Sequence, residues 1–210
     1  MDFRGERRMS SKILIRIGRY LYRLIIIIVK VIAPFFFDKK YLCGKFFENN
    51  TIGWKWVLRS LIWQKLLGFN RHVPWPVSPF IILSNPDNII FDPNNIDNFQ
   101  AFGNYFQNFN AKIYLGRGVL LAPNVGIITA NHDLDKGYEA WHEGEDVVLG
   151  NNCWIGMNSM ILPGVKLGDR TIVGAGSVVT KSFPEGYSII AGNPARIIKY
   201  LKPLENYNLK

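Results

Sequence analysis

The 210-residue chain has few cysteines, few histidines and no long uncharged hydrophobic segment. Cys43 and Cys153 cannot frame a disulfide-rich secreted domain, and they lack the CxxC spacing of a zinc site, so we expect a reducing compartment. Lys30 interrupts the most apolar stretch, whose run Leu24–Val29 is far shorter than the ~20 residues that span a bilayer. Hydrophobic residues make up 48% of the chain and charged residues 20%, which excludes wholesale disorder.

Positive charge is concentrated near the N-terminus. The chain holds 25 Lys and Arg against 16 Asp and Glu, a formal net charge of +9. Residues 1–45 contain 11 of these cations and three acids, a net of +8, which leaves +1 for the remaining residues. The body of the chain therefore offers no basic patch, and we expect no nucleic-acid partner.

The basic residues of this segment lie within an apolar helical pattern. Arg16, Arg19 and Arg23 recur at spacings of three and four, so they share one stripe of a predicted helix. A signal peptide has its charges at one end and a cleavage site, and this pattern has neither. Two interpretations of residues 1–45 are favoured over a re-entrant or spanning segment: the helix lies on an anionic membrane surface, or its apolar face packs on its own domain or on a partner subunit. A second helix is predicted over Trp54–Phe69, with one face formed by Trp54, Val57, Leu58, Leu61, Ile62, Lys65 and Leu66.

A six-residue repeat runs through the rest of the chain. Its aliphatic residues are Leu149, Ile155, Ile161, Leu167, Val173 and Val179. The same register continues upstream at Phe109, Leu115, Leu121 and Ile127, with a weaker one at Ile90, Ile96 and Phe102. A period of six matches neither a helix nor an isolated strand. It predicts short strands joined by turns, with three hexads to a coil and inward aliphatic residues stacked 18 residues apart.

This pattern resembles the hexapeptide-repeat acyltransferases, most closely the maltose and galactoside O-acetyltransferase branch and the O-acetyltransferases of surface polysaccharides. The resemblance covers about residues 79–201 and implies an all-β solenoid, a left-handed parallel β-helix with an N-terminal helical segment and a short C-terminal capping helix over Ala195–Leu201. We therefore expect a helical segment over residues 1–70, the acetyltransferase domain over 71–201 with a loop at 133–148, and a tail over 202–210. The family's trimers, with sites between neighbouring β-helices, imply a homotrimer.

The repeat breaks after residue 132 and resumes at Leu149, and a long polar loop on a rigid solenoid is a common place for a site. His132 stands at this break. The resemblance implies that His132 is the general base, a role for which imidazole has a suitable pKa, although a histidine taken alone reads as a solvated loop residue. Asp133 or a main-chain carbonyl would fix its tautomer. His142 and His72 are expected to be solvated and structural, and no metal is expected because the close HxxxxH pair of a related carbonic anhydrase is missing.

Other residues match substrate-binding positions of the family. Asn108 and Asn110 resemble asparagines that contact the acceptor sugar, since an amide both donates and accepts, and the alternative is that they hold turns. Met157 matches the position whose backbone N–H lies at the thioester. Gly174 and Ala175 match residues that pack on the pantetheine arm of coenzyme A.

Four residues match family positions that contact the phosphates and adenine of coenzyme A: Thr180, Lys181, Arg196 and Lys199. Three of them are cations, which the phosphates need. The segment AGNPAR over residues 191–196 is the most specific short match. The alternative for Arg196 is an ordinary surface cation.

Together these features imply a cytoplasmic, acetyl-CoA-dependent O-acetyltransferase for a sugar hydroxyl. The expected acceptor is a surface polysaccharide or its lipid-linked precursor, because the basic N-terminal segment would hold the protein at the inner face of the cytoplasmic membrane. Compared with the galactoside branch, the chain lacks one hexad and with it an acceptor-binding acid. Two alternatives stay open, an acetyltransferase for a small acceptor (a free sugar, serine or an antibiotic) and a catalytically silent β-helix that recruits partners.

Overall fold

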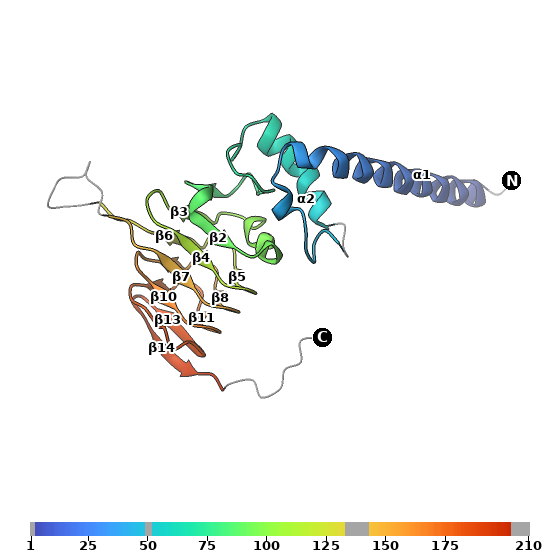
Figure 1. Ribbon diagram of the computed structural model, residues 1–210. Helices are drawn as coiled ribbons and strands as arrows, with labels where there is room; N and C mark the ends of the chain where they lie inside the picture. Colours follow the sequence, from blue (N-terminus) through green and yellow to red (C-terminus); the bar gives the residue numbers. More distant parts are fainter. Residues whose placement is uncertain (1–2, 49–51, 133–142, 203–210) are drawn as a thin grey trace.

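The computed structural model describes residues 3–48, 52–132 and 143–202. A helical N-terminal part precedes a stack of short strands (Figure 1). The helices of the chain are α1 (Phe3–Ile32), η1 (Ala33–Phe35), η2 (Lys39–Tyr41), α2 (Ile52–Ser60), η3 (Leu61–Leu66), η4 (Pro86–Asn88) and η5 (Pro93–Phe99), and the last two lie among the strands. Its strands are β1 (Ile82–Leu83), β2 (Ile89–Phe91), β3 (Tyr105–Gln107), β4 (Ile113–Leu115), β5 (Leu120–Leu121), β6 (Gly126–Ile128), β7 (Val147–Leu149), β8 (Trp154–Ile155), β9 (Met160–Ile161), β10 (Lys166–Leu167), β11 (Ile172–Val173), β12 (Val178–Val179), β13 (Ser188–Gly192) and β14 (Ala195–Tyr200). Within the described ranges no helix is both long and apolar enough to cross a membrane.

The strands form three sheets that the chain visits in turn. Sheet A has the order β1-β3-β6-β9-β12, sheet B the order β2-β4-β7-β10, and sheet C the order β5-β8-β11-β13-β14. From β4 to β12 successive strands enter sheets B, C and A in rotation, β13 and β14 both join sheet C, and neighbouring strands are parallel except β13 and β14. The chain is thus a three-sided coil of parallel strands. We name its edges by the sheets that they join: the A–B, B–C and C–A corners.

The predicted stacking of inward residues 18 positions apart is confirmed in the second half of the coil. Leu149 pairs with Leu167, and the equivalent rungs join residues 155 with 173 and 161 with 179. In the first coils the predicted register is wrong at Ile90, Phe102 and Phe109, whose side chains are 45%, 60% and 50% exposed. Phe106 takes the inward place instead and pairs with Ile127 across 21 residues, three more than in the regular coil.

The N-terminal end of the coil is closed by helices and aromatic rings. Trp75 lies within 5.0–5.2 Å of the ring centres of Tyr41, Phe91 and Phe99. Both predicted helices form, and α1 packs against α2. The face predicted for the second helix is wrong in part, since Ile62 and Leu66 are exposed.

The buried stripe of the second helix consists of Gly53, Val57, Ser60 and Gln64, of which only Val57 belongs to the predicted face. The Gln64 Nε2 donates to the backbone oxygens of Val73 and Trp75 at 2.7 and 3.1 Å, which ties the helix to the segment that enters the coil.

The C-terminal end corrects another expectation. Residues 195–200 form strand β14, antiparallel to β13, and the predicted capping helix over Ala195–Leu201 is wrong. Gly192, with φ of 105°, begins the turn between the two strands. Residues 195–200 form a strand because the edge of β13 offers backbone hydrogen-bond partners to them. The β-branched residues Ile197 and Ile198 also favour a strand.

Candidate functional site

His132 lies where the chain leaves the coil at the A–B corner. Strand β6 ends at Ile128, the next two residues are buried, and the His132 side chain is exposed. An exposed imidazole that follows directly on a buried strand end has solvent access and a fixed backbone origin. Asp133 and His142, the other residues of interest in this loop, lie outside the described residues.

A buried glutamine of the preceding coil fixes this strand end. The Gln107 Oε1 accepts hydrogen bonds from the backbone N–H groups of Thr129 and Ala130 at 3.1 and 3.2 Å. Its Nε2 donates to the Ala130 oxygen at 3.1 Å. The Thr129 hydroxyl also donates to the Gln107 backbone oxygen at 3.0 Å. The backbone two residues before His132 is therefore held by one amide side chain.

The far end of the loop returns to the same place. The backbone N–H of Glu145 donates to the Thr129 oxygen at 2.7 Å, so the chain leaves and re-enters the coil beside Gln107. Sequence reasoning missed Gln107, since its partners lie 22 and 23 residues away. The sequence signal that could have identified Gln107 is its position as a polar amide directly after Phe106, a buried residue of a short strand.

The two predicted acceptor asparagines lie in different environments. Asn108 is fully buried, and its amide is engaged with Asn85: Oδ1 accepts from the Asn85 N–H at 3.1 Å and Nδ2 donates to the Asn85 oxygen at 2.5 Å. This is the turn-holding role that the sequence left open. The Asn110 side chain is exposed and lies three residues after β3, whose last residue is Gln107.

The residues predicted at the acetyl group and pantetheine arm lie together at the C–A corner. Met157 follows β8, and Gly174 and Ala175 follow β11, the neighbouring strand of sheet C. The N–H of Gly176 donates to the Met157 oxygen at 2.8 Å, so the two turns stack. Met157 is 44% exposed, and Ala175 is exposed as well. A Cβ at Gly174 would lie 2.8 Å from the Ala191 Cβ, so packing between coils also requires this glycine.

The residues predicted at the nucleotide are all exposed. Thr180 and Lys181 follow β12, which joins β6 through β9 in sheet A, so they share the A–B corner with His132. The Lys181 Nζ lies 5.6 Å from the centre of the Phe183 ring. Arg196 and Lys199 lie on β14, where the Arg196 Nη1 donates to the backbone oxygen of Ala195 at 2.9 Å.

The structure thus places most of the predicted residues at two corners on either side of sheet A, and it places Arg196 and Lys199 on β14 of sheet C. One hexad spans at most about 20 Å, which is the largest separation of these corners along a coil. His72, predicted to be structural, lies before the coil and has a nitrogen 3.2 Å from the Leu83 oxygen. Among the described residues no three His, Cys, Asp or Glu side chains gather in a way that could hold a metal ion.

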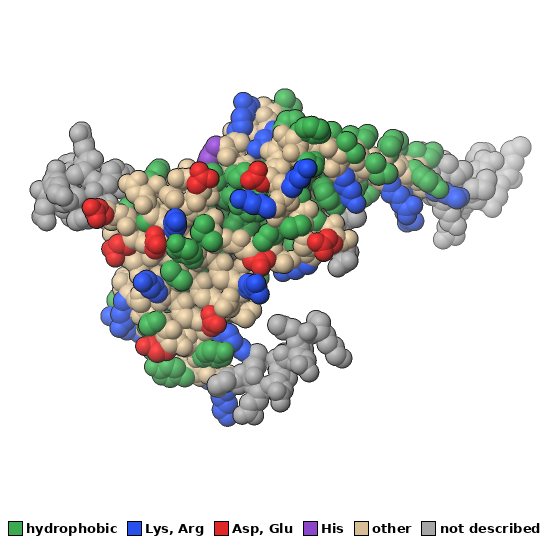
Figure 2. Space-filling view, viewed as in Figure 1, with side chains coloured by type: hydrophobic (Ala, Val, Ile, Leu, Met, Phe, Trp, Pro, Cys, Tyr) green, Lys and Arg blue, Asp and Glu red, His purple; other side chains and the backbone are tan. Residues whose placement is uncertain are grey.

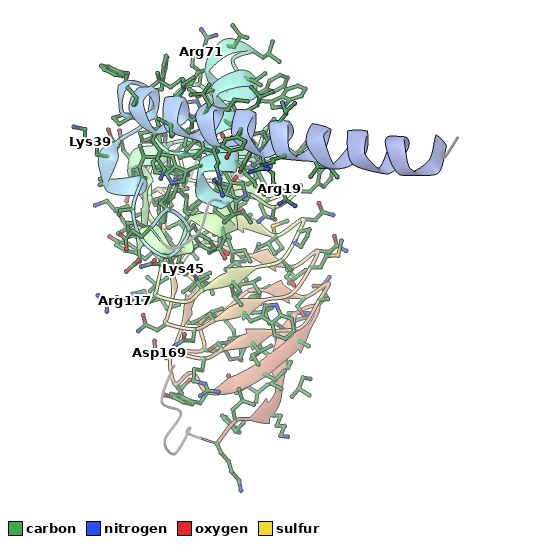
Figure 3. The ribbon with its side chains drawn as sticks, turned by 90° about the vertical axis from the view of Figure 1, so that its right-hand side faces the viewer. Arg19, Lys39, Lys45, Arg71, Arg117 and Asp169 are labelled. Atoms are coloured by element: carbon green, nitrogen blue, oxygen red, sulfur yellow. The ribbon has the colours of Figure 1, made fainter. Side chains whose placement is uncertain are left out.

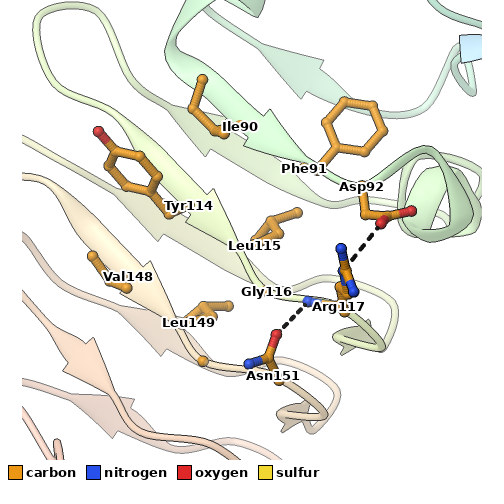
Figure 4. Close-up of a pocket in the computed structure, with 11 residues that line it drawn as sticks. Ile90, Phe91, Asp92, Tyr114, Leu115, Gly116, Arg117, Val148, Leu149 and Asn151 are labelled. Atoms are coloured by element: carbon orange, nitrogen blue, oxygen red, sulfur yellow. Dashed lines mark hydrogen bonds and ion pairs between the residues drawn. The ribbon is translucent and has the colours of Figure 1, made fainter. Parts of the chain in front are cut away.

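A surface cavity of about 380 Å³ lies near the third corner, and none of the predicted catalytic or substrate-binding residues lines it (Figure 4). It runs over the outer face of sheet B toward the B–C corner. There Arg117 Nε lies 3.5 Å from an Asp92 oxygen, and its backbone N–H donates to Asn151 at 2.9 Å. In Figure 3, Arg117 and Asp169 mark this edge, which is thereby held by contacts within the chain.

Comparison with known proteins identifies relatives of the coil. Residues 146–181 match the family model described as bacterial transferase hexapeptide (six repeats). A putative acetyltransferase of Saccharomyces cerevisiae is 38% identical over 125 residues, which are 54% of this chain and 63% of the relative. The galactoside O-acetyltransferase of Escherichia coli is 36% identical over 114 residues, 50% of this chain and 55% of the relative. The chain therefore spans between half and two thirds of the length of these curated relatives.

Solved structures give the same result. A galactoside acetyltransferase in complex with coenzyme A is 33% identical, with a TM-score of 0.52 over 61% of this chain and 62% of that one. A hexapeptide-repeat-containing acetyltransferase of Vibrio cholerae is 27% identical, with a TM-score of 0.51 over 60% of this chain and 70% of that one. The resemblance to hexapeptide-repeat acetyltransferases of the galactoside kind, predicted from the sequence, is therefore confirmed.

Proposed function

We propose that this protein is an acetyl-CoA-dependent O-acetyltransferase for a sugar hydroxyl, with His132 as the general base. The observation that carries the proposal is the exposed imidazole on a pinned strand end, in a coil similar to that of a galactoside acetyltransferase bound to coenzyme A. The resemblance also implies that the coil winds left-handed. As acceptor we propose a surface polysaccharide or its lipid-linked precursor, which is the assignment that the basic N-terminal segment favours.

The reaction requires one base and no covalent enzyme intermediate. His132 would take the proton of the sugar hydroxyl while the oxygen attacks the thioester carbonyl carbon. A new C–O bond forms, the C–S bond breaks, and the coenzyme A thiolate leaves and receives the proton from the imidazolium. The exposed Asn110 is the amide that we assign to an acceptor hydroxyl, since the Asn108 amide already bonds to Asn85.

The positive charges and small side chains at the matched positions support acetyl-CoA as the donor. The backbone N–H of Met157 would donate to the oxyanion of the tetrahedral intermediate, and Ala175 presents little side chain to the pantetheine arm. Lys181, Arg196 and Lys199 are exposed cations without a carboxylate partner among the described residues, and they suit the phosphates of the nucleotide.

The separation of His132 and Met157 on two corners also supports the proposed homotrimer. A site between copies would bring the A–B corner of one chain to the C–A corner of its neighbour. Sedimentation or light scattering should then give three times the 24.1 kDa mass of the chain.

The test is acetyl-CoA-dependent thiol release by wild type, His132→Ala and the control His72→Ala, over polysaccharides, lipid-linked glycans, free sugars, serine and an aminoglycoside. We expect acceptor-dependent release by wild type and His72→Ala, and loss in His132→Ala with acetyl-CoA binding retained. Equal release by all three would remove His132 from the mechanism. Release with small molecules alone would favour the small-acceptor enzyme, and failure to bind acetyl-CoA would favour the silent scaffold.

A further inference from the structure

Helix α1 has three distinct faces over the part whose side chains are described. At 100° per residue, Ile26 and Val29 fall on one stripe with Ala33, the first residue of η1, and all three are buried against the body of the protein. The predicted packing of the helix on its own domain therefore accounts for one face only.

The opposite face of α1 is apolar and uncovered. Ile17, Leu21, Leu24, Ile27, Ile28 and Val31 centre about 160° from the buried stripe by the same geometry. Their side chains are 49–65% exposed. A continuous apolar stripe over four turns is unusual on a soluble surface, where large exposed apolar patches mark interaction sites.

A second segment extends this surface. Trp63, Leu66, Leu67 and Phe69, in and after η3, are 43–71% exposed, and Phe35 at the end of η1 is 82% exposed. Figure 2 shows apolar side chains along the outer edge that α1 and the region around η3 form, on the side away from the coil. We call α1, η1 and residues 61–69 the apolar platform.

Basic groups border this platform. Arg16, Arg19 and Arg23 occupy the stripe of α1 between its buried and apolar faces, and with Tyr20 they line a small surface hollow of about 170 Å³. The ion pairs among the described residues are Lys40–Asp38 and Arg117–Asp92, so these three guanidinium groups have no carboxylate partner there. Arg71 lies beyond α1, near η3, in Figure 3.

We propose that the apolar platform docks on an anionic phospholipid bilayer, with lipid phosphates bound by Arg16, Arg19 and Arg23. Apolar side chains would enter the headgroup boundary while the arginines stay at the phosphate level, as in interfacial helices. A second copy of this chain is a poorer occupant, because residues 1–45 carry a net +8 and two such segments repel each other. The proposal is independent of acetyl transfer, and it adds residues 61–69 to the segment that the charge pattern indicates.

The experiment is flotation of the full chain with vesicles of phosphatidylcholine alone or mixed with phosphatidylglycerol. Wild type should bind the anionic vesicles more tightly by a factor on the order of 100, since each arginine at the surface contributes about fivefold. Arg16→Gln/Arg19→Gln/Arg23→Gln should lose most of this factor. Leu24→Glu/Ile28→Glu should weaken binding at least about tenfold by removing inserted apolar surface.

The matched control is Ile82→Glu/Leu120→Glu, which adds the same negative charge to exposed apolar positions of the coil, 64% and 51% exposed in wild type. It should leave vesicle binding within about twofold of wild type. Circular dichroism of each variant checks that the helices persist. A blue shift of tryptophan emission on vesicles, abolished in Trp63→Phe, would place the η3 segment in the interface.

Three results would overturn the proposal: no flotation of wild type with anionic vesicles, equal weakening by the control pair, or loss of a self-associated state in Leu24→Glu/Ile28→Glu without vesicle binding by wild type. The last would assign the platform to a contact between copies of this chain.

Discussion

Replacing Gln107 tests whether the strand end before His132 must be rigid. In Gln107→Leu the backbone N–H and oxygen of Ala130 lose the partners described here, while Thr129 N keeps its bond to the Gln107 backbone oxygen at 3.0 Å. An unsatisfied buried backbone group costs about 1–3 kcal/mol, so two of them lower the free energy of unfolding by about 2–6 kcal/mol. A fall in the catalytic rate should accompany the loss of stability, since a misplaced base lowers the rate steeply.

We expect kcat to fall about 10- to 100-fold in Gln107→Leu, which is the effect of a displacement near 1 Å. The KM for acetyl-CoA should stay within about twofold, because Met157 and Ala175 lie on another corner. The assays are steady-state thiol release and urea unfolding. Gln107→Glu keeps the acceptor atoms but places a carboxylate oxygen against the Ala130 oxygen, and it should fall between wild type and Gln107→Leu.

The matched control is Gln100→Leu. The Gln100 amide is half-buried, whereas that of Gln107 is buried, and it likewise donates to a backbone oxygen, that of Pro76, at 2.7 Å, but it lies in the N-terminal part of the coil. This variant should lose stability and keep kcat. A Gln107→Leu protein that is destabilised yet turns over normally would refute the positioning role, and equal loss of kcat in both variants would show that general destabilisation is responsible.

Three further expectations concern stability and reactivity. Burial raises the pKa of Asp97, whose Oδ1 has no described partner, so ionisation of this carboxyl opposes folding at neutral pH. Asp97→Asn should therefore raise the free energy of unfolding by up to about 1 kcal/mol at pH 7. Denaturant titrations at several pH values should show this gain vanish as the pH falls through the raised pKa toward the ordinary value of 3.8. Burial raises the pKa of the fully buried Cys153 to about 11, so in the folded protein at pH 8 a thiol reagent should label at most Cys43, and a second rapid reaction would contradict this. Gly156→Ala should destabilise by roughly 2–4 kcal/mol because a Cβ would lie 2.6 Å from backbone of the next coil, whereas Gly18→Ala, with open space around it on α1, should be neutral or stabilising by thermal unfolding.

The sequence predicted what depends on short-range spacing. Leu149 and Leu167 stack because hexads repeat without interruption between them, and each strand is too short for its own propensity to matter. The β14 segment shows the limit. Residues 195–200 accept a helix or a strand, and the choice is made by the free edge of β13 rather than by local preference.

The polar contacts of the candidate site were beyond sequence reasoning for a similar reason. Gln107 and Asn108 each bind backbone 22 or 23 residues away, in the next or the preceding coil. Spacing arguments place side chains on a face, but they do not reveal which buried amide meets which backbone group. Only the winding of the coil brings Gln107 to the residue pair before His132.

The long step from β6 to β7 leaves the strand register of sheet B unchanged. In sheet B, Ile113 pairs with Val147 across 34 residues, while the next rung joins Val148 to Lys166 across 18, and both rungs belong to one uninterrupted ladder. The 16 additional residues therefore leave no trace in the strand register, and lengthening such a loop costs only about 0.6 kcal/mol per doubling. We expect that the segment between His132 and Glu145 can change in length while the bond from the Glu145 N–H to the Thr129 oxygen keeps the rest of the coil in register.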